Sequence, residues 1–418
     1  MTATVTLSDR LPLRCGLVLP NRMMKSALSE GLADAGHGPD VRLERLYTRW
    51  GAGGYGLVVT GNVMVDRDHL GEPGNVVIDD DRDMDAVTRW AKATKDGGVP
   101  IWMQINHPGR QANPLATRHR PVAPSAVAPK IPGMPTPRAL TDAEIEAIID
   151  RFAATAGVAE AAGFDGVQIH GAHGYLVSQF LSPSANQRTD RWGGDPQRRM
   201  RFVLEIVRRI RATVAPSFAL GIKLNSADFQ RGGFSEDESR NVVGQLADEA
   251  IDLIEISGGS YESPAMMGRD GRSASTRARE AYFLDYAQTV RAVAGAVPLA
   301  VTGGFRTVTA MADAVGSGAC DLVGIGRPTC TIPDAAASVL GTETDRLAAV
   351  SITAGLRGPL AKMSFARSFD GALDLQWHTD QLHRLGAGLD PDPQRPWWKT
   401  MVTMLQRNGL DAFRSKRS

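Results

Sequence analysis

Three residues that can donate protons or hydrogen bonds, His170, His173 and Tyr175, lie close together within residues 163–192. They follow an apolar run that is typical of one buried strand. In a continuing strand, His170 and His173 would point to opposite faces, but the small residues between them indicate that the strand ends and the chain turns. We therefore expect both imidazoles and the phenol to point into one pocket, and we place the chemistry there.

The elements that position this group alternate between short apolar runs and amphipathic helical patterns. Eight strands with intervening helices predict an α/β fold, a (β/α)8 TIM barrel. Such a barrel usually needs roughly 250 residues, and we assign residues 1–330 to it. The expected strands are Met23 to Ala27, Leu57 to Val63, Ile101 to Asn106, Gly166 to His170, Ala219 to Leu224, Asp252 to Ser257, Leu299 to Val301 and Asp321 to Ile325.

Helix starts are marked by residues that cap the first turn. A Ser or Thr followed three residues later by Glu predicts a capping box, and Asp before Pro predicts an N-cap with proline at the first helical position. The pairs are Thr141 with Glu144, Ser235 with Glu238, and Asp195 with Pro196.

Two segments add to a plain barrel. Residues 107–140 are rich in proline, which favours a long extended loop after the third strand, on the face where barrel enzymes build their sites. Residues 331–418 form a C-terminal extension with helical patterns. It packs under the barrel or onto a second subunit, so a homo-oligomer is one expectation.

The composition is that of a soluble enzyme. The chain has 418 residues, of which 43% are hydrophobic and 22% charged, and its formal net charge is +1. This balance gives no reason to expect nucleic acid or a membrane as a partner, and no targeting or spanning segment is found, so we expect a cytoplasmic protein. Three cysteines are too few for a four-cysteine iron–sulfur site.

Strand alternation gives a clue to a cofactor. In residues 219–225, the apolar side chains share one face, so Lys223 must point into the barrel, where an unpaired ammonium is costly and needs an anion. The same alternation turns Trp102, Gln104, Asn106, Gln168, His170 and Glu255 inward. We expect something polar and planar to fill the upper barrel. Gln104 and Glu255 are alternatively expected to hydrogen-bond each other across it, and Trp102 to be a packing residue.

Glycines end the last two strands. Gly303 and Gly304 follow the seventh, and Gly326 with Arg327 follow the eighth. Barrels commonly hold a phosphate there, with backbone N–H groups and a nearby helix N-terminus, and Arg327 adds a bidentate cation. Each glycine taken alone is a simple turn glycine, but their joint position predicts a phosphate site.

Several motifs together resemble one known family, the Old Yellow Enzyme or NADH:flavin oxidoreductase family of FMN-dependent barrel enzymes, in a single-domain form without an iron–sulfur cluster. The resemblance covers about residues 10 to 330. Its matching stretches are LPNRMMKSAL (19–28), GLVVTGNVMV (56–65), QINHPGR (104–110), PVAPSA (121–126), the segment 163–192, VTGG (301–304) and IGRP (325–328).

The resemblance implies an NAD(P)H-dependent ene-reductase with tightly bound, non-covalent FMN. A nicotinamide reduces FMN at N5, and the hydride then passes to the β-carbon of an α,β-unsaturated carbonyl compound. The implied roles are Ser26, Ala27 and Leu28 on one flank of the ring, Gly61 and Gln104 near its pyrimidine edge, Lys223 by N1 and O2, Gly303, Gly304, Gly326 and Arg327 at the phosphate, His170 and His173 at the substrate oxygen, and Tyr175 as proton donor.

The chain departs from the family pattern at three positions. Ser29 stands where relatives place threonine or cysteine near the flavin, and Lys223 stands where many carry arginine. Glu30 and Gly31 stand just beyond Ser29, where some relatives have an aromatic residue. We expect the flavin potential and the substrate preference to differ accordingly.

Two other functions compete with this interpretation. A metal-dependent barrel hydrolase would use His170 and His173 as ligands, but it would need further histidines or carboxylates at other strand ends. A non-catalytic flavin-binding protein would keep Lys223, Gln104 and Arg327 but would not need Tyr175. Taken singly, His170 is a core histidine and Tyr175 a packing aromatic residue.

Overall fold

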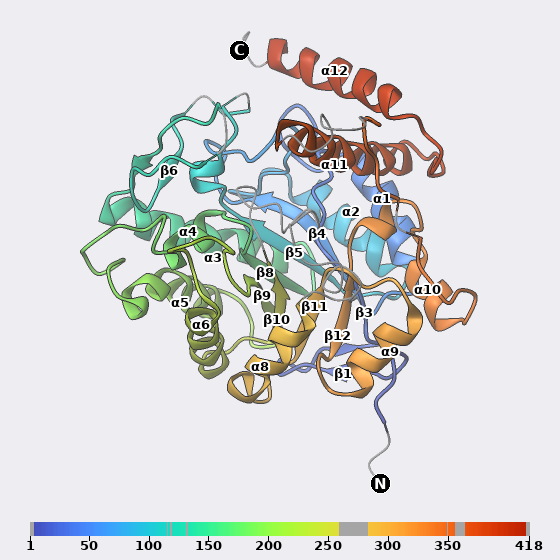
Figure 1. The fold of residues 1–418 in the computed structure, drawn as a ribbon, viewed down its shortest axis with the longest axis horizontal. Coiled ribbons are helices and arrows are strands. Elements are labelled where there is room, and N and C mark those ends of the chain that lie inside the picture. Colours follow the sequence, from blue (N-terminus) through green and yellow to red (C-terminus); the bar gives the residue numbers. More distant parts are fainter. Residues whose placement is uncertain are drawn as a thin grey trace.

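Eight parallel strands close into a barrel, and all eight lie where the sequence predicts them (Figure 1). The computed structural model describes residues 4–114, 116–117, 119–130, 133–258, 283–348, 350–355 and 364–414. The strands follow the order β10-β11-β12-β3-β4-β5-β8-β9 around the barrel. They are β3 (Met23–Lys25), β4 (Leu57–Met64), β5 (Ile101–Asn106), β8 (Gly166–Gly171), β9 (Ala219–Asn225), β10 (Leu253–Ser257), β11 (Leu299–Thr302) and β12 (Leu322–Ile325).

Helices surround the barrel and cover the outer faces of its strands (Figure 1). The predicted capping boxes at Thr141 and Ser235 are both present, and the Asp195 side chain accepts from the Arg198 N–H at the start of its helix. The helices of the barrel are α1 (Val41–Gly51), α2 (Met84–Lys95), α3 (Asp142–Ala161), α4 (Leu176–Leu181), α5 (Pro196–Thr213), α6 (Glu236–Asp248), α8 (Leu284–Ala294) and α9 (Val308–Gly316). Among the described residues, no helix is long and apolar enough to span a membrane.

Side chains alternate along β9 as the sequence predicts. Leu220, Ile222 and Leu224 of β9 belong to the large core between strands and helices, whereas Ala219 belongs to a smaller apolar cluster inside the barrel. A short hairpin of β1 (Leu11–Pro12) and β2 (Val18–Leu19) adds leucines to that inner cluster. The lower barrel is therefore a closed apolar floor.

Trp102 forms part of this floor. Its side chain is fully buried, and a Cβ added at Gly221 would approach the Trp102 ring to 2.5 Å, while one at Gly166 would come within 2.9 Å of its Nε1. Two neighbouring strands thus need glycine to admit the indole. Trp102 is a packing residue, as expected, and it supports whatever lies above it.

The loop after β5 contains a short 3-10 helix, η1 (Gly109–Gln111), and two short paired strands, β6 (Val122–Ala123) and β7 (Arg138–Ala139). It is thus less irregular than a simple extended loop. Gln111 reaches from η1 to the turn that contains His173. The loop therefore contacts the candidate site.

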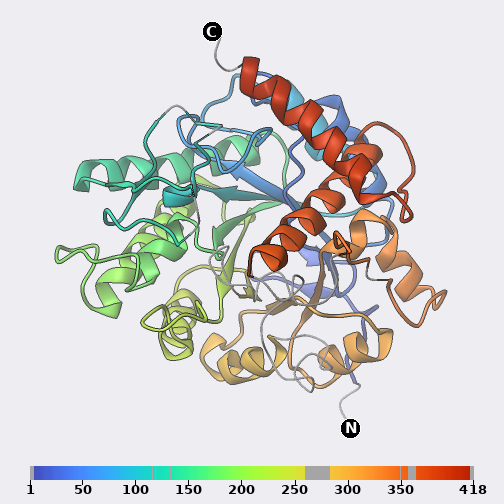
Figure 2. The same cartoon turned by 45° about the horizontal axis from the view of Figure 1, so that its top comes forward.

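The C-terminal extension consists of α10 (Ala335–Leu340), α11 (Ser364–Gly386) and α12 (Trp397–Arg414). Helix α11 packs against α1 and against η3 (Arg327–Cys330), which directly follows β12. His383 Nε2 lies 2.9 Å from the main-chain oxygen of Glu30, in the loop after β3. Helix α11 thus lies at the carboxyl-end rim of the barrel (Figure 2), because η3 and the loop after β3 leave the strands at that end. Helix α10 instead contacts the turn before β4, where the Ala337 N–H donates to the main-chain oxygen of Gly53 at 2.9 Å.

Candidate active site

The structure brings His170, His173 and Tyr175 together at the carboxyl end of β8. The ring centroids of His170 and His173 are 5.1 Å apart, and those of His170 and Tyr175 are 4.8 Å apart, both in edge-to-face arrangements. Only 4% of His170 and 6% of Tyr175 is exposed. The strand ends at Gly171 and the chain turns before α4, which is the local geometry that the glycines predict.

Two glutamines that the sequence did not point to hold this turn. His173 has a left-handed backbone with φ of 61°, which is uncommon for a residue other than glycine. Gln111 Nε2 donates to the main-chain oxygens of His173 and Gly174 at 3.1 and 2.9 Å, and Gln179 Nε2 donates to that of Gly174 at 2.8 Å. The loop after β5 and helix α4 therefore fix the direction of the His173 side chain.

Both histidines of the group are neutral at pH 7. Burial lowers the pKa of His173 to about 3, with a further contribution from the charge of Lys223. Burial also lowers the pKa of His170 well below its usual value, helped by His173 and Lys223. The Ala172 N–H donates to His170 Nδ1 at 3.3 Å. The proton of the neutral His170 ring must then be on Nε2, which makes Nε2 a hydrogen-bond donor.

The second histidine has a partner of its own. His173 Nε2 lies 3.0 Å from the Oγ of Ser257, the last residue of β10. Ser257 can donate to or accept from this nitrogen, so the contact is compatible with either neutral tautomer of His173. Strand alternation turns Ser257 inward with Glu255, so a signal for it existed in the sequence, but the pairing depends on the turn.

Lys223 already has an anionic partner within the protein. This corrects the expectation that its ammonium needs the anion of a cofactor. Its Nζ lies 3.0 Å from Glu255 Oε1, and the two residues are register partners on β9 and β10. Their side chains are 4% and 0% exposed. A buried inward lysine is therefore no proof of a cofactor here, because a neighbouring strand already supplies a carboxylate.

The pair extends into a chain of amides across the barrel. Gln168 Nε2 donates to Glu255 Oε2 at 2.8 Å, and Gln104 Nε2 donates to Gln168 Oε1 at 2.7 Å. The expected direct bond between Gln104 and Glu255 is wrong, since Gln168 lies between them. The inward polar layer predicted from strand alternation thus exists, with its members linked in one line.

The glycines at the ends of β11 and β12 adopt turn conformations. Gly303 and Gly304 have φ of 127° and 91°, a backbone region that residues other than glycine rarely adopt. Gly326 immediately precedes η3. Arg327, the predicted phosphate ligand, donates from its Nη1 to Asp374 of α11 at 2.8 Å, and its side chain is 38% exposed.

Residues 26–30 follow β3, and their side chains contact different parts of the protein. Ser26 Oγ is 2.7 Å from Thr302 Oγ1 on β11, and Ser29 Oγ donates to the carboxylate of Glu72. The side chains of Ala27 and Leu28 are partly buried. Glu30 is buried.

The buried Glu30 is hydrogen-bonded to the middle of β4. Its Oε1 accepts from the Gly61 N–H at 2.9 Å and from the Tyr47 hydroxyl at 2.5 Å. Burial raises the pKa of Glu30, against the effect of nearby Lys25. Gly61 therefore directs its N–H away from the barrel axis, toward the layer between strands and helices.

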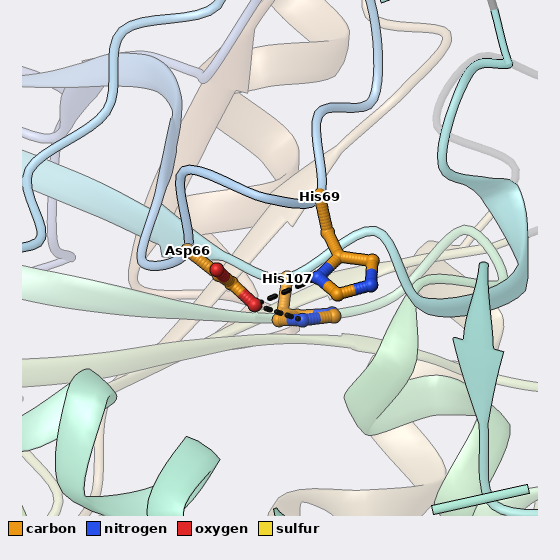
Figure 3. Close-up of side chains that lie close together, drawn as sticks. All are labelled: Asp66, His69 and His107. Atoms are coloured by element: carbon orange, nitrogen blue, oxygen red, sulfur yellow. Dashed lines mark hydrogen bonds and ion pairs between the residues drawn. The ribbon is translucent and has the colours of Figure 1, made fainter. Parts of the chain in front are cut away.

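A second group of titratable residues lies outside the barrel, where the loops after β4 and β5 meet (Figure 3). Asp66 Oδ2 is 2.8 Å from His69 Nδ1 and 3.3 Å from His107 Nε2. Within the described residues this is the group of three that could hold a metal ion. It contains neither His170 nor His173, the ligands that a metal hydrolase was expected to use.

Hydrogen bonding makes this group a clamp between loops. The Gly109 N–H donates to His107 Nδ1 at 3.0 Å, so neutral His107 carries its proton on Nε2, facing Asp66. A metal ion on Nε2 would require that proton on Nδ1, against the Gly109 N–H. Arg151 also pairs with Asp66. Burial lowers the pKa of His107 to about 4, which keeps it neutral.

Comparison with known proteins identifies the family. The model of the NADH:flavin oxidoreductase / NADH oxidase family matches residues 12–340. The chain belongs to this family.

Relatives agree with the assignment. The NADH-dependent flavin oxidoreductase iliE of Hypocrea jecorina is 40% identical over 345 residues, which are 77% of this chain and 86% of that protein. The NADH-dependent flavin oxidoreductase iccE of Talaromyces variabilis is 39% identical over 356 residues, which are 79% of this chain and 85% of that protein. A solved Old Yellow Enzyme homologue from Zymomonas mobilis superimposes with a TM-score of 0.70 at 25% identity, covering 83% of this chain and 95% of that chain.

FMN and a nicotinamide nucleotide are the cofactors of this NADH:flavin oxidoreductase. The inward residues suit such a ring. They offer a cation at Lys223 and an amide at Gln104, whose side-chain oxygen accepts no hydrogen bond from any residue the structure describes. The left-handed turn at Gly303 and Gly304 is suited to binding an anion through backbone N–H groups.

Proposed function

We propose that this NADH:flavin oxidoreductase reduces the activated C=C bond of α,β-unsaturated carbonyl compounds in a ping-pong reaction. The observation that supports this proposal is the group of His170, His173 and Tyr175 beside the inward Lys223. His170 and Lys223 are register partners on adjacent strands. Donors for an oxygen atom and a proton therefore stand next to the cation of the inward polar layer.

The proposed cofactor site uses residues on or just after six strands of the barrel. Lys223 and Gln104 would hold the pyrimidine edge of the ring, with Gly61 nearby. Ser26, Ala27 and Leu28 line one flank of the ring. The phosphate is held by Gly303, Gly304, Gly326 and Arg327, the last of which is already held in place by Asp374. When bound, FMN takes a hydride from the nicotinamide and gives one to the β-carbon of the alkene.

The two histidines bind the carbonyl oxygen of the substrate. As the alkene is reduced, negative charge develops on that oxygen, and fixed hydrogen-bond donors stabilise it. His170 Nε2 carries a proton because its Nδ1 accepts from Ala172. Since both rings are neutral, they donate hydrogen bonds without placing two more positive charges beside Lys223.

Tyr175 donates the proton that completes the reduction at the α-carbon. Its ring packs on His170 at the start of α4, so the phenol lies beside the group that binds the carbonyl oxygen. Positioned general acids contribute roughly 10²- to 10⁴-fold in rate. A phenol suits this step because it keeps its proton at neutral pH.

The experiment that tests the function separates the two half-reactions. The purified protein should be yellow and should release FMN on heating, and the photoreduced protein should be reoxidised by 2-cyclohexenone in stopped-flow measurements. Tyr175→Phe should slow this reoxidation roughly 10²- to 10⁴-fold and leave reduction by NADH or NADPH unchanged. Tyr55→Phe, at a buried tyrosine that precedes β4 and belongs to the large apolar core, is the matched control.

Each alternative predicts a different result. If the protein releases FMN but shows no alkene-dependent reoxidation, the result would refute the ene-reductase activity and support a non-catalytic flavin-binding protein. Normal reoxidation of Tyr175→Phe would refute the proton donor. A phenol such as 4-hydroxybenzaldehyde should give a long-wavelength charge-transfer band, and its persistence in the variant with both His170→Ala and His173→Ala would refute the role of the histidines.

A further inference from the structure

The carboxylate of Glu255 contacts two members of the inward polar layer, Lys223 with one oxygen and Gln168 with the other. Its Oε1 pairs with Lys223 Nζ at 3.0 Å and its Oε2 accepts from Gln168 at 2.8 Å. Glu255 is fully buried on the central face of β10. We propose that Glu255 is a positioning residue that lowers the reduction potential of the bound FMN. This inference rests on the proposed placement of the ring above Gln104 and Lys223.

The first step of the argument is the charge of the pair. Lys223 alone would favour the reduced cofactor, because reduction adds negative charge that an adjacent ammonium stabilises. A carboxylate 3.0 Å from the ammonium offsets much of that field in a buried site where water screens little. The ring therefore meets a compensated pair and not a bare cation.

The second step is the direction of the amide chain. An ionised carboxylate only accepts hydrogen bonds, so Gln168 must turn its NH₂ group to Glu255. The oxygen of Gln168 then faces Gln104, which must also turn its NH₂ group inward along the chain. This leaves the oxygen of Gln104 available to accept from N3–H of the ring. The charge of Glu255 thus decides which atom Gln104 offers.

Both steps predict the same experiment on the holoenzyme. In Glu255→Gln, the Lys223 charge is no longer offset and the amide chain can reverse. The ratio of reduced-FMN to oxidised-FMN affinity should rise about 10- to 100-fold, which for a two-electron couple is a positive shift of about 30 to 60 mV. The potential is measured by equilibration with reference dyes during slow enzymatic reduction.

Two variants serve as references. Glu255→Asp keeps the carboxylate and should restore a potential close to that of the natural sequence. Asp165→Asn removes a carboxylate that pairs with Lys95 just before β8, at the amino-terminal end of the barrel, and should leave the potential unchanged. Equal shifts in Asp165→Asn and Glu255→Gln would show a general effect of lost charge and overturn the inference.

The outcomes separate this inference from the proposed function. Natural protein that binds no FMN refutes the cofactor placement. Glu255→Gln with FMN bound and a potential unchanged within error overturns the role of Glu255, even if alkene reduction is normal. If Glu255→Gln does not fold, Gln168→Met keeps the ion pair but frees Gln104, and an unchanged potential together with unchanged FMN affinity in that variant overturns the inference.

Discussion

Two buried lysine–glutamate pairs lie on opposite faces of the same barrel wall. Lys223 and Glu255 face the interior at 3.0 Å, whereas Lys25 and Glu30 face the helices at 3.8 Å. Lys25 Nζ lies 3.8 Å from the centre of the Trp50 ring and donates to the main-chain oxygen of Val59 at 3.0 Å. The outer pair is thus surrounded by an aromatic ring and backbone, whereas the inner pair is hydrogen-bonded to side-chain amides.

The difference shows what a buried charge does and does not reveal. Both lysines have a carboxylate from the protein, so neither requires a cofactor to remain buried. What distinguishes them is the surroundings, because amides and histidines offer hydrogen bonds to a ligand and aromatic rings do not. Burial lowers the pKa of Lys25 to about 8, against the effect of Glu30. The outer pair is a structural element.

Acidic pH should have the largest effect on stability, through three histidines that are buried as neutral rings in the candidate active site and in the Asp66 group. The pKa of His107 is about 4 and that of His173 about 3, and that of His170 is also low, because burial disfavours the charged form. An unfolded histidine titrates near 6.5, so the unfolded state binds more protons and stability falls as pH drops from about 6.5 toward 4. Each ring costs up to about 1.4 kcal/mol per pH unit, and all three about 4.

Urea unfolding of the holoenzyme between pH 7.5 and 5 measures this slope. His107→Asn should remove about a third of it and His170→Asn with His173→Asn about two thirds. A free energy of unfolding that does not change over this range would contradict the neutral state of these histidines.

Removal of one partner of the outer pair should have the next largest effect. Lys25→Met leaves Glu30 buried without its cation, and such a change typically costs about 3–5 kcal/mol. The FMN potential should stay the same, since Lys25 faces the helices. Urea unfolding and dye equilibration measure the two quantities. A loss under 1 kcal/mol, or a shifted potential, would show that the outer pair differs from this description.

The sequence was sufficient to predict the strands and which of their side chains face inward, but not which residues on other elements pair with those side chains. Alternation is a local property, and it correctly turned Gln104, Lys223 and Glu255 inward. Which carboxylate meets Lys223 depends on the register between β9 and β10, which barrel closure sets. Asp374, the partner of Arg327, comes from an extension whose docking no local pattern shows.

Removal of both partners should separate stability from function. Replacing a buried ion pair by apolar residues is often neutral or stabilising. Lys25→Met with Glu30→Leu should therefore restore the free energy of unfolding to within about 2 kcal/mol of the natural protein, with an unchanged potential. Lys223→Met with Glu255→Leu should regain stability in the same way but lose FMN affinity, because no cation remains at the ring. Equal FMN binding by both double variants would refute the distinction.

An exposed pair should give the smallest effect and set the reference for the others. On α2, Lys92 Nζ lies 2.6 Å from Asp96 Oδ1, closer than the charges in either buried pair, but the two side chains are 69% and 62% exposed. Water screens such a pair, and exposed pairs four residues apart on a helix contribute about 0.3–0.5 kcal/mol. Lys92→Met should change the free energy of unfolding by no more than that. If it costs as much as Lys25→Met, then separation rather than burial determines the energy of these pairs, and the contrast between the two faces of the wall loses its physical basis.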